Sequence, residues 1–275
     1  MLQEGITQLY LRQQSEFTAG DLDLIQDFLG RLDKGEVRAA EPSEGAWKVN
    51  TWVKKGILLA FRAGVIRTYD GGGDFSFFDK DNLPLKKLRT EDGVRLVPGG
   101  SAIRYGAYVA PGVTCMPPMY INVGARVEAQ SMIDSHALVG SCAQVGKRVH
   151  VSAGAQIGGV LEPIGATPVV IEDEALVGGQ AGLFEGVVVR RRAVISAGVI
   201  LTRSTPIYDL AQERILRSSQ NQGLEVPEGA VVVPGSRAVD TDFARAHGLS
   251  ITTPLIVKYR DSKTEASIQL EQALR

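Results

Sequence analysis

The sequence predicts a mainly β protein whose central half is a parallel β-helix, a solenoid of short strands. An aliphatic residue or a cysteine recurs every six residues from Ile103 to Ile157, and the series resumes in a second phase from Ile171 to Ile207. A small or short-branched residue follows each member four positions later, with Met119 as the one departure. A period of six matches neither a lone helix nor a lone strand, but it fits coils in which each face is one hexapeptide long.

The chain before the solenoid, residues 1–95, predicts a small helical domain. Apolar residues three and four apart over 6–14 and 21–35 are typical of amphipathic helices. Asp21 is the expected N-cap of the second helix, and Gly35 its expected stop.

A third helix is expected to start near Asn50, and the glycine-rich stretch 71–86 is expected to be turn and loop. A domain this small is not expected to form a stable hydrophobic core of its own. We therefore expect it to pack on the solenoid or on a neighbouring subunit.

The predicted β-helix covers residues 96–236, with three hexapeptides to each triangular coil. Residues 103–157 then make three coils and 171–207 two more, with the aliphatic and small positions pointing inward. Turn-forming residues fall at the corners, where many would take positive φ: Gly106, Pro111, Gly112, Gly124, Gly140, Gly146, Gly154, Gly178 and Gly198.

Two insertions are expected to leave the coil, near 158–170 and 208–225. The first breaks the phase of the repeat, and the second is too polar and too long for a corner. Residues 226–236 supply a last coil fragment. The C-terminal region, 237–275, is expected to hold a strand over 249–263 and a short helix over 267–275.

Composition excludes several function classes. The net charge is −1, so no global basic field indicates a nucleic acid or membrane partner. Two cysteines cannot form a disulfide framework, and no segment has the length and polarity expected of a membrane span or a signal peptide. These features predict a cytoplasmic protein.

Several longer strings narrow the hexapeptide pattern to one family. Residues 119–163, which contain GSCAQVGKRVHVSAG and GGVLEP, resemble the central segment of the tetrahydrodipicolinate N-succinyltransferase family. Residues 93–117 resemble its entry into the solenoid, and 48–62 also fit. The later strings EDEALVGG, VISAGVILTRSTPIYD and VVVPGS resemble its last coils. The resemblance therefore covers most of the chain.

This resemblance implies a left-handed β-helix, a homotrimer, and active sites in clefts between neighbouring subunits. It implies transfer of succinyl from succinyl-CoA to the amine of ring-opened tetrahydrodipicolinate, in lysine and diaminopimelate biosynthesis. The products would be N-succinyl-2-amino-6-oxopimelate and CoA. No metal and no tightly bound cofactor are expected, because the thioester is already activated.

Attack of an amine on a thioester needs a general base, oxyanion donors and a grip on the acceptor's carboxylates. By resemblance, Asp134 in MIDSHA is the expected base and a substrate contact. Arg95 in GVRLVP is by resemblance the expected ligand of a substrate carboxylate. The positions that contact CoA are not identified.

A second family carboxylate is absent at the expected place, because Gly182 stands where many members carry a glutamate. Glu185, three residues later, either supplies this acid from another corner or is an exposed turn residue. A site with a single acid is favoured, because a shift of three residues should point the side chain away from the cleft.

Other reactive side chains have a weaker case. His150 lies within the matched string as a possible contact, His136 is close to Asp134, and His247 lies in a C-terminal loop. The run Arg190, Arg191 and Arg192 could meet CoA phosphates, although charge runs are usually solvated. Cys142 is interpreted as structural.

Three alternatives share the solenoid. One is another CoA-dependent N- or O-acetyltransferase, which should use a catalytic histidine. A γ-type carbonic anhydrase needs three clustered histidines for zinc, and this chain has only three in all. A structural or ice-binding β-helix should show flat rows of threonine, which are absent from the sequence.

Overall fold

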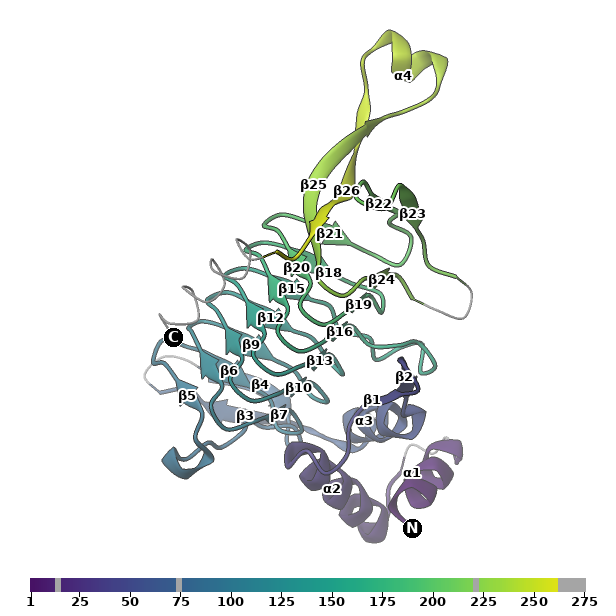
Figure 1. The fold of residues 1–275 in the computed structure, drawn as a ribbon. Coiled ribbons are helices and arrows are strands. Elements are labelled where there is room, and N and C mark those ends of the chain that lie inside the picture. Colours follow the sequence, from purple (N-terminus) through teal and green to yellow (C-terminus); the bar gives the residue numbers. More distant parts are fainter. Residues whose placement is uncertain (13–15, 73–75, 220–222, 262–275) are drawn as a thin grey trace.

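A computed structural model describes residues 1–12, 16–72, 76–219 and 223–261, and Figure 1 shows their arrangement. A tapering stack of coils occupies the centre, helices lie at one end beside the N-terminus, and a long hairpin projects from the other end. The predicted class, a left-handed β-helix with an N-terminal helical region, is confirmed.

The coils stack in register to make three parallel faces. Arg126 pairs with Gln144, eighteen residues later, so one coil holds three hexapeptides as predicted. The β7 sheet contains β7 (Tyr108–Val109), β10 (Arg126–Val127), β13 (Gln144–Val145), β16 (Val170–Ile171), β19 (Val188–Val189) and β24 (Glu225–Val226).

The second face is the β8 sheet, and the third is the β6 sheet. The β8 sheet contains β5 (Arg95–Leu96), β8 (Thr114–Cys115), β11 (Met132–Ile133), β14 (His150–Val151), β17 (Leu176–Val177), β20 (Val194–Ile195) and the start of β25 (Ala230–Ala238). The β6 sheet contains β6 (Ala102–Ile103), β9 (Tyr120–Ile121), β12 (Leu138–Val139), β15 (Gln156–Ile157), β18 (Gly182–Leu183) and β21 (Ile200–Leu201).

The predicted inward positions form the main core. Every aliphatic member of the repeat is at most 6% exposed, and Met119 is buried as well at 3%. One member departs from the prediction, because Ile207 leaves the coil in β22 (Ile207–Asp209) and its place in the β7 sheet passes to Val226. Ile207 is still fully buried in the same core.

The corners use two kinds of residue. Gly106, Gly112, Gly124, Gly154 and Gly198 have positive φ, as predicted. The predicted glycines Gly140, Gly146 and Gly178 do not have positive φ, and they serve a different need, because the next coil lies where a Cβ would be. Non-glycine residues also take the left-handed conformation at corners, among them His136 and Glu185.

The N-terminal region contains α1 (Leu2–Leu11), α2 (Ala19–Asp33) and α3 (Thr51–Ala63), and η1 (Thr90–Asp92) precedes the first coil. Asn50 is the N-cap of α3, and Gly35 follows α2 at φ 75°, as predicted. The prediction that Asp21 is the N-cap of α2 was wrong. Thr18 is the N-cap, and Asp21 is the third helical residue, which forms a capping box with Thr18.

The helices pack on the solenoid, which supplies part of their core. Val123 and Cys142, at the corner between the β6 and β7 sheets, are buried in one cluster with Ile57 and Phe28. This confirms that the helical region packs on the solenoid, although most of the buried residues in the cluster belong to the helical region itself.

Two hairpins interrupt the region that was expected to be helix and loop. β1 (Ala40–Ser43) and β2 (Ala46–Val49) pair through a turn with positive φ at Glu44 and Gly45. β3 (Ile66–Asp70) pairs with β4 (Ser76–Lys80), so the expected loop over 71–86 was wrong in part. Phe77 and Phe78 on β4 remain exposed, so this strand lacks the half-buried alternation by which strands are recognised.

Both predicted insertions leave the coil. No strand lies between Ile157 and Val170, and the second insertion forms a hairpin of β22 with β23 (Arg214–Leu216). At the C-terminal end β25 pairs with β26 (Ser250–Tyr259), the predicted strand, and α4 (Asp242–Ala246) lies at the tip of the arm. The expected terminal helix over 267–275 lies outside the described residues.

We predict that Gly178→Ala destabilises the protein by about 1–3 kcal/mol, the range for overpacked interiors. Its Cβ would lie 2.5 Å from the backbone nitrogen of Ala197 on the next coil. Gly165→Ala is the control, because nothing lies within 4 Å of that Cβ and Gly165 has no positive φ. Denaturant unfolding of the two variants should separate them, and equal midpoints would contradict the close stacking of coils.

Candidate active site

The outward face of the β8 sheet brings two predicted substrate residues onto one surface. In this sheet Arg95 pairs with Thr114, Thr114 with Met132, and Met132 with His150. Asp134 directly follows β11, at the corner where the chain turns toward the β6 sheet. Arg95 is exposed, and the side chain of Asp134 is 26% exposed.

Backbone and side-chain contacts fix the Asp134 carboxylate. The Asp134 backbone N–H donates to the Val151 carbonyl on the next coil at 2.9 Å. The Asp134 Oδ1 atom accepts the Ser135 N–H at 2.7 Å. The second oxygen, Oδ2, lies 3.6 Å from His150 Nε2, beyond hydrogen-bonding distance but within ion-pair range. One oxygen is thus occupied, and the other faces the imidazole.

The three histidines have different surroundings. The His150 side chain is 8% exposed and contacts Asp134 as described. His136 is exposed and forms the corner itself, with φ 61° and its N–H donating to Pro118 O. His247 ends α4 at the tip of the arm, where its ring packs on Phe243. Only His150 is placed close to the Asp134 carboxylate.

Glu185 lies on a different corner from Asp134. It follows β18 where the chain passes from the β6 sheet to the β7 sheet, two coils further along. Its backbone has φ 54°, and its Oε2 accepts the Arg203 N–H on the next coil at 3.2 Å. Within one subunit Glu185 therefore has a corner-forming role and is not on the face that carries Arg95.

At Gly182, the family glutamate position, the space for a side chain is filled. A Cβ there would lie 2.5 Å from the Phe184 ring and 2.9 Å from Ile200 Cδ1. Phe184 thus occupies the place next to the backbone from which a glutamate at 182 would project.

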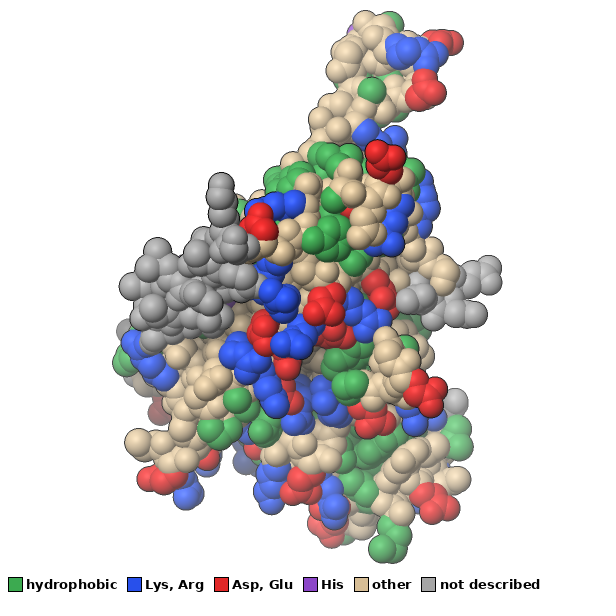
Figure 2. Space-filling view, in the orientation of Figure 1, with side chains coloured by type: hydrophobic (Ala, Val, Ile, Leu, Met, Phe, Trp, Pro, Cys, Tyr) green, Lys and Arg blue, Asp and Glu red, His purple; other side chains and the backbone are tan. Residues whose placement is uncertain are grey.

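The arginine run is engaged mostly within the chain. Arg190 donates to Glu172 Oε1 at 2.8 Å and to Glu225 Oε1 at 2.7 Å. Arg191 donates to Glu174 Oε1 at 2.9 Å, and hydrogen bonding to Glu174 raises the pKa of Arg191. Figure 2 shows the resulting band of interleaved acidic and basic side chains on the visible face. Two of the three arginines are therefore committed to carboxylates of neighbouring coils.

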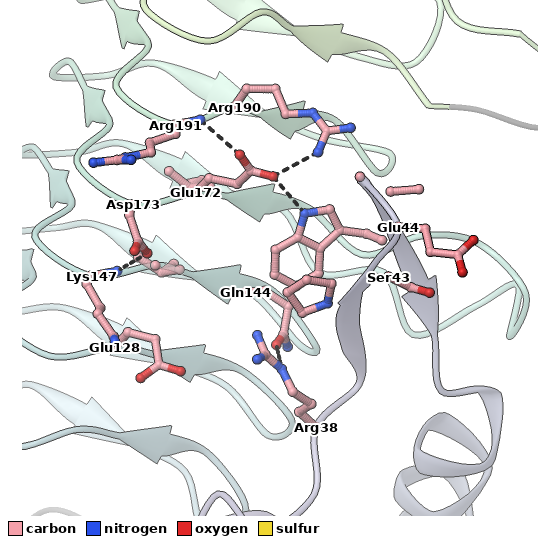
Figure 3. A pocket seen from close by; sticks show the side chains of 17 residues that line it. Arg38, Ser43, Glu44, Glu128, Gln144, Lys147, Glu172, Asp173, Arg190 and Arg191 are labelled. Carbon is pink, nitrogen blue, oxygen red and sulfur yellow. Dashed lines mark hydrogen bonds and ion pairs between the residues drawn. The ribbon is translucent and has the colours of Figure 1, made fainter.

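A cavity of about 520 Å³ lies against this band, between the β1–β2 hairpin and the coils (Figure 3). Its volume is that of a small-molecule site. Residues from both elements line it: Arg38, Pro42, Ser43, Glu44, Gly45, Ala46, Trp47, Glu128, Gln144, Val145, Gly146, Lys147, Ile171, Glu172, Asp173, Arg190 and Arg191.

Trp47 forms a fixed wall of this cavity. Its Nε1 donates to Glu172 Oε1 at 3.0 Å, and the Arg38 guanidinium lies 5.3 Å from the centre of its ring. Arg38 Nε in turn donates to Gln144 Oε1 at 3.0 Å. Sequence reasoning missed this constellation, because nothing in the repeat indicates that a hairpin residue meets a coil residue about one hundred positions later.

A lysine is fully buried where the helices meet the first insertion. Lys54 is 0% exposed, and its Nζ donates to Ala166 O at 2.5 Å. Burial lowers the pKa of Lys54 and raises the pKa of the nearby Cys142 thiol to about 12. Cys142 is therefore a buried, protonated packing residue, in line with its structural interpretation.

Within the described ranges, no group of three or more His, Cys, Asp or Glu side chains could hold a metal ion. The same part of the chain has no helix of the length and apolarity that crossing a membrane requires.

Comparison with family models gives two matches. Residues 1–63 match the model described as the N-terminal part of tetrahydrodipicolinate N-succinyltransferase. Residues 168–203 match the hexapeptide repeat of succinyl-transferase. The two matches fall on the helical region and on the later coils.

Curated relatives align over nearly the whole chain. Proteins of Afipia carboxidovorans and Nitrobacter winogradskyi are each 42% identical, and the alignment covers 94% of this chain and 92% of each relative. A protein of Acinetobacter baylyi is 40% identical over 95% of this chain and 94% of its own length. All three are named 2,3,4,5-tetrahydropyridine-2,6-dicarboxylate N-succinyltransferase.

Proposed function

We propose that this chain, which belongs to the tetrahydrodipicolinate N-succinyltransferase family, transfers succinyl from succinyl-CoA to the amine of ring-opened tetrahydrodipicolinate. The products are N-succinyl-2-amino-6-oxopimelate and CoA, a step of lysine and diaminopimelate biosynthesis. The alignment at 42% identity over 94% of the chain carries this proposal.

Arg95 and Asp134 act on the acceptor in this proposal. Arg95 lies on β5, and Asp134 directly follows β11, two strands further along the same sheet. Two steps of about 4.8 Å give roughly 10 Å along the stack, a span that an extended seven-carbon dicarboxylate and two side chains can bridge. Arg95 offers a two-pronged guanidinium to a terminal carboxylate, and the amine then lies toward Asp134.

Asp134 is the proposed general base. The amine nitrogen attacks the thioester carbonyl carbon, so an N–C bond forms and the C–S bond breaks as CoA leaves. The attacking amine loses a proton to the Oδ2 atom of Asp134, which faces His150, while the other oxygen is held by the Ser135 N–H. Because Oδ1 is tied to the backbone, the carboxylate keeps one orientation through the reaction.

We further propose a homotrimer with a site between subunits. Arg95 is exposed and the side chain of Asp134 is 26% exposed, so solvent reaches both in one subunit. In the proposed trimer a neighbouring copy would enclose the face that carries them. The cytoplasm is the proposed location, because acyl-CoA donors are intracellular metabolites, and two buried free thiols suit a reducing compartment.

We predict that Asp134→Asn loses most of its turnover while keeping its fold, because the amide preserves size but removes basicity. Glu185→Gln is the matched control on another corner and should stay within about twofold of the wild-type kcat. Thiol release from succinyl-CoA, with acetyl-CoA in parallel, measures both variants. Wild-type turnover in Asp134→Asn would contradict its role, and a tenfold loss in Glu185→Gln, about 1.4 kcal/mol of barrier, would establish a relocated acid.

We predict that Arg95→Lys raises KM for the amino acceptor more than KM for succinyl-CoA. Lysine keeps the charge but lacks the planar fork that binds a carboxylate through two hydrogen bonds. Initial-rate kinetics with each substrate varied in turn gives the two constants. An equal rise in both would indicate a general disturbance of the cleft.

Sedimentation velocity tests the assembly, and a single trimeric species is expected at micromolar concentration. A monomer that retains full activity would rule out the shared site.

A further inference from the structure

Four basic and four acidic side chains line the cavity beneath the β1–β2 hairpin, and two of the basic ones form no ion pair with its carboxylates. Of its four basic residues, Arg190 and Arg191 are ion-paired with glutamates. Arg38 and Lys147 have no ion pair among the described residues. In Figure 3 Lys147 lies beside Asp173 on the coils, and Arg38 lies below Gln144.

The position of the Arg38 side chain disfavours its positive charge. Burial lowers the pKa of Arg38 and the positive charge of Arg126 lowers it further, while the carboxylates of Glu128 and Glu41 partly offset this shift. The guanidinium nevertheless keeps its position, because Gln144 fixes Nε and the Trp47 ring lies beside it. A carboxylate at the remaining guanidinium N–H groups would relieve this cost without rearrangement.

The rim of the cavity carries the opposite charge. Glu44 lies at the hairpin turn, and the carboxylate of Asp173 lies beside Lys147, whose backbone N–H it accepts at 2.8 Å. Neither carboxylate has an ion pair within the described ranges. The cavity therefore offers two free cations, two free carboxylates and one aromatic wall.

We propose that this cavity is a second small-molecule site, one that binds an α-amino dicarboxylate. Its carboxylates bind Arg38 and Lys147, its ammonium group faces Asp173 beside Lys147, and its carbon chain lies against Trp47. The site is distinct from the proposed transfer site, because Arg95 and Asp134 lie on the β8 sheet and its corner with the β6 sheet. This inference does not depend on the proposed function.

Occupancy would connect two parts of the molecule. Arg38 and Trp47 belong to the segment between α2 and α3, whereas Lys147 and Asp173 belong to the coils. A ligand that contacts both stabilises the docked hairpin and raises the melting temperature by linkage. Binding of a dicarboxylic amino acid at this site would therefore strengthen the contact between the helical region and the solenoid as the concentration of that amino acid rises.

L-glutamate is the probe, with glutarate and 1,5-diaminopentane as analogues that lack the ammonium group or both carboxylates. Isothermal titration calorimetry with the full-length protein should give saturable glutamate binding and at least threefold weaker glutarate binding. No binding of the diamine is expected. Equal affinity for all three compounds, or no glutamate binding at all, would refute the proposal.

Substitutions in the cavity test whether glutamate binds there. Lys147→Met and Arg38→Met should each weaken glutamate binding at least about tenfold, because each removes a charged hydrogen bond. Lys147 is exposed, so its replacement should leave the fold intact. Arg67→Met, an exposed residue of β3 outside the cavity, is the matched control and should bind normally.

Activity separates this site from the transfer site. Arg95→Met should lose acceptor turnover yet titrate glutamate like the wild type, and Lys147→Met should keep its KM for the acceptor. If Lys147→Met raises that KM in step with the loss of glutamate binding, the cavity is part of the acceptor site and the second-site proposal is wrong. Normal glutamate binding by an inactive protein would refute the proposed function alone.

Discussion

The eighteen-residue register between coils is the constraint on which the rest of the structure depends. Each two-residue strand is too short to be stable alone, and it persists because the strands one coil before and after donate and accept its backbone hydrogen bonds. The buried aliphatic column along the prism supplies the apolar contacts that hold these ladders together. A shift of one residue would turn that column outward, so the register and the hydrophobic period determine each other.

This constraint decides where chemistry can be placed. Inward positions are committed to packing, and corners are crowded by the next coil, as the glycine at 178 illustrates. Outward rows and insertions remain available. In the proposed transfer site Arg95 lies on the outward surface of the β8 sheet and Asp134 at its corner, whereas the cavity at Trp47 arises where a hairpin from the helical region lies over the β7 sheet. The two proposed sites therefore arise differently on the same solenoid: one from outward residues of the coils, the other from a hairpin that packs over the coils.

The sequence predicted what the repeat itself encodes. Inward residues from Ile103 onward, the coil length and the first insertion follow from a period of six, and the second insertion follows from its polarity and length. The hairpin β3–β4 was not predicted, because its exposed Phe77 and Phe78 follow no burial pattern. Thr18 was overlooked as a cap because Asp21 is also a good capping residue, and only the geometry shows that the two act as a pair.

The candidate site was predictable only in part, for a related reason. Asp134 and Arg95 could be located along the chain by resemblance. Their relative position could not be counted from the hexapeptides, because Arg95 lies before the repeat begins and pairs with Thr114 nineteen residues later. The contact of Asp134 with His150 follows from the register, since His150 lies one coil beyond the adjoining Met132. The pairing of Arg38 with Gln144 could not be predicted, because it depends on how a separate helical region docks on the coils.

Position 182 illustrates how tightly the stack limits the catalytic options. Gly182 pairs with Gln156 on one side and Ile200 on the other, so a side chain there would project from the middle of the β6 sheet. The Phe184 ring covers that spot, at a distance a Cβ could not tolerate. A glutamate at 182 therefore requires Phe184 to swing aside, and the glycine and the aromatic ring form one packing solution. Glu185 is bonded to the next coil at a different corner, so it does not occupy the place of a side chain at 182. This arrangement agrees with the proposal that Asp134 alone accepts the amine proton.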